Sequence, residues 1–172
     1  DVEQDILFDT QNYTSGTTKL TWFTNKVAAT HKEATTNLVK SNEMPSDSAF
    51  SIRGYELIAQ PGSTPEDLNK IYHTGWFSLK IDKDVRLTVA LRFIPAGATM
   101  WGLDNRSTGA SQVSVQWYSG GTIFSLVQTL QIEPRQVFFV IGEWSAGQSV
   151  VASVKLTFAL HGLRVDPTRT KG

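Results

Sequence analysis

The feature that most constrains how this 172-residue chain can fold is a two-residue alternation from residue 85 to residue 93, in which large apolar side chains alternate with Arg86, Thr88, Ala90 and Arg92. Successive side chains of a β-strand point to opposite faces, so this alternation gathers the apolar groups on one face. These groups are Val85, Leu87, Val89, Leu91 and Phe93. Arg86 and Arg92 fall on the other face. The pattern predicts a half-buried strand.

Related patterns recur along the chain. Residues 76–93 predict a hairpin with its turn at 82–84, and residues 113–132 predict a second hairpin around a Gly-Gly turn. The continuously apolar run 137–141 is typical of a central strand that is covered on both faces. Residues 150–165 predict one long final strand.

Two glycines mark places where the apolar phase of a strand changes. In the stretch from residue 50 to residue 59 the phase changes at Gly54, and in the last strand it changes at Gly162. A β-bulge inserts one residue into one strand and re-aims the side chains that follow it. We therefore expect a bulge at Gly54 and a bulge or bend at Gly162.

One helix is predicted. Thr64 is a good N-cap residue, and Pro65 suits the first helical position. Leu68, Ile71 and Tyr72 follow at helical spacing, so they share one side of a helix of about two turns.

The strand count sets the fold class. The expected strands begin at Lys19, Phe50, Trp76, Val85, Val113, Thr122, Gln136 and Val150. Eight strands in a chain of this length suit an all-β domain, a single eight-stranded jelly-roll barrel or sandwich with one short helix. We expect one domain over residues 1–172, with an N-terminal arm at about 1–45 and a short C-terminal tail at about 166–172.

Composition argues against several function classes. Sixteen basic residues balance sixteen acidic ones, so the chain has no overall positive charge with which to bind nucleic acid directly. The absence of cysteine excludes disulfides, thiolate metal sites and a cysteine nucleophile.

The sequence offers no catalytic constellation. His31, His73 and His161 have unrelated settings, without the spacing of metal ligands. Asp82 and Asp84 read as ordinary turn residues, and no nucleophile elbow or phosphate-binding loop is present. We therefore expect no enzymatic activity, no metal and no cofactor.

Four aromatic residues are candidate subunit contacts. Trp101 and Trp144 lie in glycine-containing segments at strand ends, where a ring can cap the open end of a barrel, contact a protein or stack on a sugar. Trp22 and Phe23 are adjacent, so in a regular strand they point to opposite faces. One of these two should then need cover from outside the core, which a partner subunit would provide.

The order of motifs from residue 36 to residue 57 resembles one protein family. Thr36-Asn37-Leu38, then Glu43-Met44-Pro45, then Phe50-Ser51-Ile52-Arg53-Gly54 match a polar arm that leads into a barrel strand. This segment resembles the small single-jelly-roll major capsid proteins of tailless icosahedral phages with an internal membrane, of the type that infects Thermus. About 25 residues carry the resemblance.

The resemblance implies a structural role in a virion, in a protein made in the host cytoplasm. It implies self-assembly as a homodimer or higher oligomer, co-assembly with a second capsid protein, and proximity to an internal lipid membrane. In this interpretation, Phe50 begins the first main barrel strand and the polar arm contacts a neighbouring copy. The alternative is a carbohydrate-binding jelly-roll module that uses Trp101 and Trp144 as stacking platforms.

Overall fold

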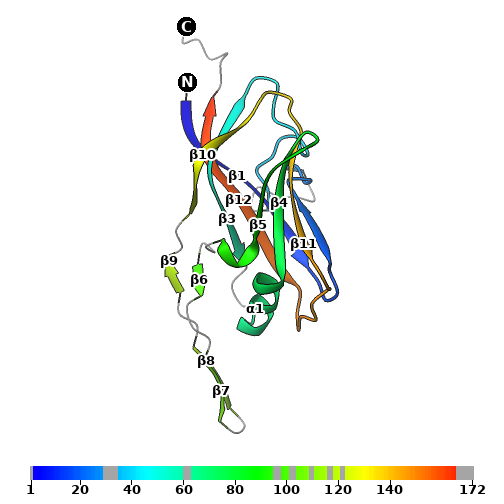
Figure 1. Cartoon of the computed structure of the whole chain (residues 1–172), viewed down its shortest axis with the longest axis vertical. Helices are drawn as coiled ribbons and strands as arrows, with labels where there is room; N and C mark the ends of the chain where they lie inside the picture. Colours follow the sequence, from blue (N-terminus) through cyan, green and yellow to red (C-terminus); the bar gives the residue numbers. More distant parts are fainter. Residues whose placement is uncertain are drawn as a thin grey trace.

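Two four-stranded antiparallel sheets pack face to face in the computed structural model of the chain (Figure 1). The residues that the structure describes are 2–28, 35–59, 63–94, 98–100, 104–108, 111–115, 118–120 and 123–165.

The strand order of the two sheets defines the topology. Sheet A contains, from edge to edge, β1 (Val2–Tyr13), β12 (Val154–Val165), β3 (Ala49–Ala59) and β10 (Phe124–Ile132). Sheet B contains β2 (Lys19–Trp22), β11 (Phe138–Trp144), β4 (Gly75–Ile81) and β5 (Asp84–Ala90). Apart from the β4–β5 hairpin, successive strands of the sandwich alternate between the sheets, which is the connectivity of a jelly roll. The predicted all-β class is confirmed.

The remaining elements lie outside the two sheets. They are the helix α1 (Pro65–Thr74), the 3₁₀ turn η1 (Leu91–Phe93), and the short strands β6 (Ala98–Met100), β7 (Asp104–Thr108), β8 (Ser111–Val115) and β9 (Tyr118–Gly120). β6 pairs with β9 and β7 pairs with β8, so these four strands form nested hairpins between β5 and β10. Figure 1 shows them extending away from the sandwich.

The helix forms where the sequence predicts it. Thr64 accepts a hydrogen bond from the Asp67 amide through its hydroxyl, which satisfies one amide of the first turn. Ile71 is fully buried, and the Ile71 carbonyl accepts a 2.9 Å hydrogen bond from the Trp144 indole. The helix therefore closes one end of the sandwich.

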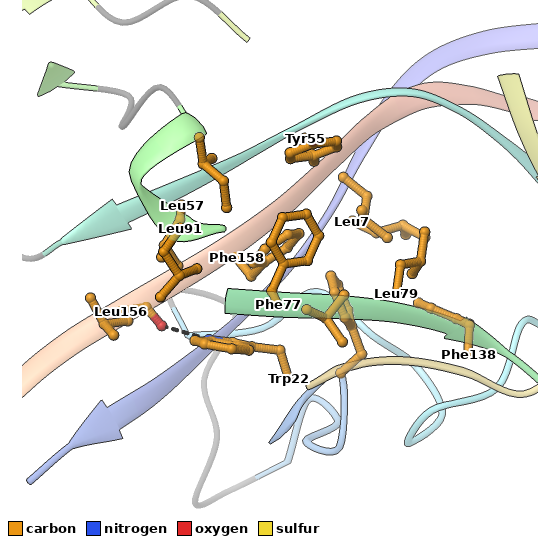
Figure 2. Close-up of a cluster of buried hydrophobic side chains, with 14 of the residues drawn as sticks. Leu7, Trp22, Tyr55, Leu57, Phe77, Leu79, Leu91, Phe138, Leu156 and Phe158 are labelled. Carbon is orange, nitrogen blue, oxygen red and sulfur yellow. Dashed lines mark hydrogen bonds between the residues drawn. The ribbon is translucent and has the colours of Figure 1, made fainter. Parts of the chain in front are cut away.

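Aromatic side chains from both sheets fill the core (Figure 2). The Phe77 ring of sheet B lies 5.0 Å from the rings of both Tyr55 and Phe158 of sheet A. The Trp22 indole donates a 2.9 Å hydrogen bond across the core to the Leu156 carbonyl, drawn as a dashed line in Figure 2. Burying rings of this size supplies a large part of the hydrophobic stabilisation.

The two predicted glycine irregularities meet at one bulge. His161 of β12 pairs with Gly54, but Gly162 pairs with Ile52, so Arg53 is the extra residue on β3. Gly162 is needed there for space, because a Cβ atom at this position would lie 2.1 Å from the Ser51 carbonyl oxygen. The bulge expected at Gly54 and the bulge or bend expected at Gly162 are therefore confirmed.

Several expectations about strands are wrong. Much of the segment expected as an N-terminal arm belongs to the sandwich: β1 pairs with β12 along its whole length, and β2 pairs with β11. The strand that contains Phe50, β3, is therefore the third strand and begins at Ala49. The hairpin expected over residues 113–132 does not form, because β8 pairs with β7 and β10 pairs with β3. β5 ends at Ala90, where η1 replaces the strand expected to reach Phe93.

Candidate interaction surface

Three of the four proposed contact residues are buried inside the chain. Trp22 and Phe23 are completely buried, and Trp144 is 3% exposed. Trp101 lies outside the described residues. The expectation that either Trp22 or Phe23 needs external cover is wrong, and Trp144 has no free ring face for a sugar.

The backbone at Phe23 explains why two adjacent aromatic rings are both buried. Phe23 has a positive φ of 70°, which breaks the alternation of the strand and turns this ring inward beside Trp22. The buried carboxylate of Asp9 holds this conformation by accepting a 2.7 Å hydrogen bond from the Phe23 amide. Asn25 and Gln11 also donate to the Asp9 carboxylate, at 3.1 and 3.0 Å.

The edge of sheet A at β1 is covered by residues 35–37 of the same chain. The Thr10 amide donates to the Thr35 carbonyl at 2.8 Å, and the Phe8 amide donates to the Asn37 side chain at 2.9 Å. The Asn37 side-chain amide in turn donates to the Ile6 carbonyl. This segment was expected to contact a neighbouring copy, but these hydrogen bonds tie it to its own β1.

The opposite side of the sandwich carries exposed apolar groups. β10 is the other edge of sheet A and β5 is an edge of sheet B. Because β1 and β2 contact each other at the first side, β5 and β10 share the opposite one. We call this side the open side. It is defined by five large hydrophobic residues with 36% to 109% exposure: Val85, Phe93, Ile123, Phe124 and Val127. Half of the ten large exposed hydrophobic residues among the described ones lie on or next to β5, η1 and β10. Exposed apolar surface on a folded domain often marks an interaction site.

On the open side, partly buried apolar residues pack against the core, and both edge strands are irregular. Four partly buried residues of β5 and β10 pack against the core there: Leu87, Val89, Leu126 and Leu130. On β10, residues 126–129 lie opposite the single residue Arg53, and on β5 the register shifts at Arg86. Bulged edges resist the addition of a further strand, so side chains are the better means of contact on this side.

The tyrosine beneath the open side has an unpartnered hydroxyl. Tyr55 is 1% exposed, and its ring stacks on Phe124 with centroids 4.9 Å apart. No hydrogen bond reaches the Tyr55 hydroxyl, and burial raises the pKa of Tyr55 to about 12. Burial also raises the pKa of Tyr72, whose hydroxyl instead donates to the Leu57 carbonyl at 3.0 Å.

Other polar features of the described residues are a hollow in the surface and a histidine–carboxylate pair. A hollow of about 510 Å³ is lined by Thr24, Asn25, Lys26, Ala28, Val39, Lys40, Ser41 and Glu43. Within it, Lys40 pairs with Glu43 at 2.9 Å. His161 and Glu56 form a 2.8 Å pair on sheet A. In the part of the chain that the structure describes, no three potential metal ligands cluster, and no helix is long and apolar enough to cross a membrane.

The sequence held only a partial signal for the open side. Val85 and Phe93 share the apolar phase of Leu87 and Leu91, so periodicity alone placed all of them on one buried face. The structure exposes 54% of Val85, because the register shift at Arg86 pairs Val85 with Lys80 and places it on the opposite face from Leu87. It exposes 60% of Phe93, which lies beyond the end of β5. The uncharged composition of residues 123–132 was the other available signal.

Comparisons of the chain with protein-family models, with curated proteins and with solved structures found no match.

Proposed function

We propose that this protein is a structural subunit of an icosahedral virion shell, and that the open side contacts a neighbouring subunit. The observation that carries the proposal is the jelly-roll sandwich with half of its large exposed hydrophobic residues, among those described, on or next to β5, η1 and β10. The partners proposed are further copies of the chain and a second capsid protein, in a virion capsid that lies near an internal membrane.

Three features support a structural role in a shell. Trp22, Phe23 and Trp144 are buried in the core. The Trp22 indole forms a hydrogen bond from sheet B to sheet A, and the Trp144 indole forms one to helix α1. The β1 edge is covered by the chain itself, and the β5 and β10 edges are bulged, so uncontrolled strand pairing is disfavoured. The motif order from residue 36 to residue 57 adds the resemblance to capsid proteins.

The test is the state of association of the purified protein. Size-exclusion chromatography with light scattering should show dimers or larger species, and electron microscopy of concentrated protein should show regular assemblies. The open-side variant, Phe93→Gln with Val127→Gln, should shift the protein to smaller species. The matched control is Val39→Gln with Val151→Gln, which changes two valines that are 72% and 83% exposed elsewhere.

A wild-type protein that stays monomeric at high concentration, alone and with virion proteins, would refute this function. An open-side variant that assembles like the control would show that shell contacts lie elsewhere.

A further inference from the structure

The outer face of sheet A is more apolar than a face that meets water usually is. β1 and β12 pair without a register shift along their whole length, so directly opposite residues share a face. The outward positions of these two strands alternate with the buried ones, and six of them are apolar: Val2, Ile6 and Phe8 on β1, and Ala159, Leu163 and Val165 on β12. The solvated face of an antiparallel sheet is normally polar. This face therefore has the composition of a surface that a partner covers.

The apolar outer face is accessible. Val2 is 61% exposed and Ile6 is 40% exposed. Ile123, which is 41% exposed, extends the surface to β10, because its side chain lies over Gly54 of β3. The described elements outside the two sheets have their main contacts elsewhere: α1 and η1 contact each other and β4 of sheet B, and β6 to β9 pair among themselves.

The charged groups on this face are few. Glu56 is the one carboxylate at the outward positions of β1, β12 and β3, and a 2.8 Å hydrogen bond joins it to the ring of His161. The two side chains are only 14% and 13% exposed. Lys155 lies at the start of β12, away from the apolar residues that follow His161. The chain itself thus satisfies the acidic group on this face.

The outer face of sheet B has a different composition. Its outward positions include Lys19 of β2, Lys80 of β4 and Glu143 of β11, as the register of these strands shows. Three charged side chains are typical of a face that stays in water. Of the two outer faces, that of sheet A is therefore the better suited to association.

We propose that two copies of the chain associate face to face through the outer face of sheet A. Strands of about twelve residues and a width of four strands give a face of roughly 40 by 19 Å, or about 750 Å². This is close to the ~800 Å² that each partner buries in a standard protein interface. The hydrogen-bonded Glu56 leaves no acidic group that a partner must neutralise, so a second copy of the same face is a fitting occupant. The open side takes no part in this contact, which therefore goes beyond the proposed function.

The contact has two-fold symmetry. Two copies that use the same surface form an isologous contact, which closes at the dimer. The β5 and β10 edges lie outside this contact in both copies. Open-side contacts would then join dimers into larger assemblies.

Cysteine protection locates the contact. The chain contains no cysteine, so a single introduced cysteine reports on one place. Ile6→Cys should react with a maleimide at least about tenfold more slowly at concentrations where light scattering shows dimers than after dilution to monomers. Val39→Cys, at a position that is 72% exposed, is the control and should react equally fast in both samples. Val127→Cys reports on the open side in the same assay.

Charge placed on the face gives a second readout. Val2→Lys with Ile6→Lys should weaken the dimer about hundredfold, because both charges would be buried between the two copies. Both side chains are exposed in one copy, so thermal unfolding of this variant should match that of the wild type. The matched control, Val39→Lys with Val151→Lys, adds the same charge elsewhere and should dimerise normally.

A dimer in which Ile6→Cys stays reactive would overturn this inference, and protection of Val127→Cys in that dimer would leave the proposed function intact. A lysine variant that dimerises like its control would overturn the inference equally. Protection of Ile6→Cys by phosphatidylcholine vesicles, in a protein that stays monomeric, would assign the face to lipid instead of a second copy. A protein that is monomeric under all conditions would overturn both proposals.

Discussion

The two edges of sheet A differ in what covers them. At β1, residues 35–37 of the same chain form hydrogen bonds with the main-chain groups of Ile6, Phe8 and Thr10 that point away from β12. At β10, residues 126–129 leave the ladder, and Val127 is fully exposed. The first edge is closed by hydrogen bonds within the chain, whereas the second is only made irregular.

The difference separates residues that stabilise the fold from residues free to contact a partner. The segment that covers β1 includes Thr36, which is completely buried and forms an isolated bridge with Asp9. The exposed side chains on β5 and β10 contribute little burial, so substituting them should leave the fold intact. Variants at the β1 edge should therefore change the free energy of unfolding, whereas variants at the β5 and β10 edges should change self-association.

The largest expected effect on stability is the loss of the buried carboxylate that holds β1. Asp9→Ala should lower the free energy of unfolding by about 3 kcal/mol, because the Phe23 amide and the Asn25 side chain lose their acceptor. Urea denaturation measures the change. Asp47→Ala, at an exposed position, is the control and should stay within about 0.5 kcal/mol of the wild type. A loss below 1 kcal/mol at Asp9 would mean that this edge does not depend on the carboxylate.

A smaller loss is expected when the cover is loosened. Asn37→Ala removes the two side-chain hydrogen bonds to Phe8 and Ile6, and should cost about 1–2 kcal/mol. It should also increase self-association at high concentration, because more of the β1 edge is then unpaired. Denaturation and light scattering on the same samples measure the two effects, with the exposed Asn12→Ala as the control. Unchanged association would argue that the cover does not protect the edge.

The smallest effect is expected beneath the open side. Tyr55→Phe removes a buried hydroxyl that has no partner, so the free energy of unfolding at pH 7 should stay the same or rise by up to about 1 kcal/mol. Tyr72→Phe, which removes a hydrogen bond to the Leu57 carbonyl, should instead cost about 1 kcal/mol. Equal losses in the two variants would imply an unseen partner for the Tyr55 hydroxyl.

Alkaline pH gives Tyr55→Phe a second readout. The folded-state pKa of Tyr55 is about 12, above the ordinary value of 10.0, so unfolded Tyr55 ionises first as the pH rises. This residue therefore leaves stability unchanged below pH 10 and lowers it between pH 10 and pH 12. The variant should lose less stability than the wild type over that interval, as measured by urea denaturation at each pH.

The parts of the fold that the sequence predicted correctly depend on short-range patterns. Short stretches of sequence were enough to predict the hairpin of β4 and β5, the cap of α1 at Thr64, the central β11 and the phase changes at Gly54 and Gly162. β1 was missed because two polar residues, Asp9 and Gln11, interrupt the apolar alternation between Leu7 and Tyr13 on its inward face.

The candidate site was harder to predict, because exposure is decided by partners distant in the sequence. Trp22 and Phe23 looked like a core residue and a surface residue, but the positive φ of Phe23 turned both inward. The spacing of apolar residues does not indicate which residue other than glycine adopts a positive φ. Likewise, the sequence of β10 does not show that residues 126–129 lie opposite a single residue of β3.

The four short strands between β5 and β10 extend away from the sandwich (Figure 1). Among the described residues, these strands pair only with each other. The register of the eight main strands therefore does not depend on the length of the segment between β5 and β10. A reporter peptide inserted between β7 and β8 should therefore leave the pairing of the eight main strands unchanged, which makes this connection a useful attachment point for engineering.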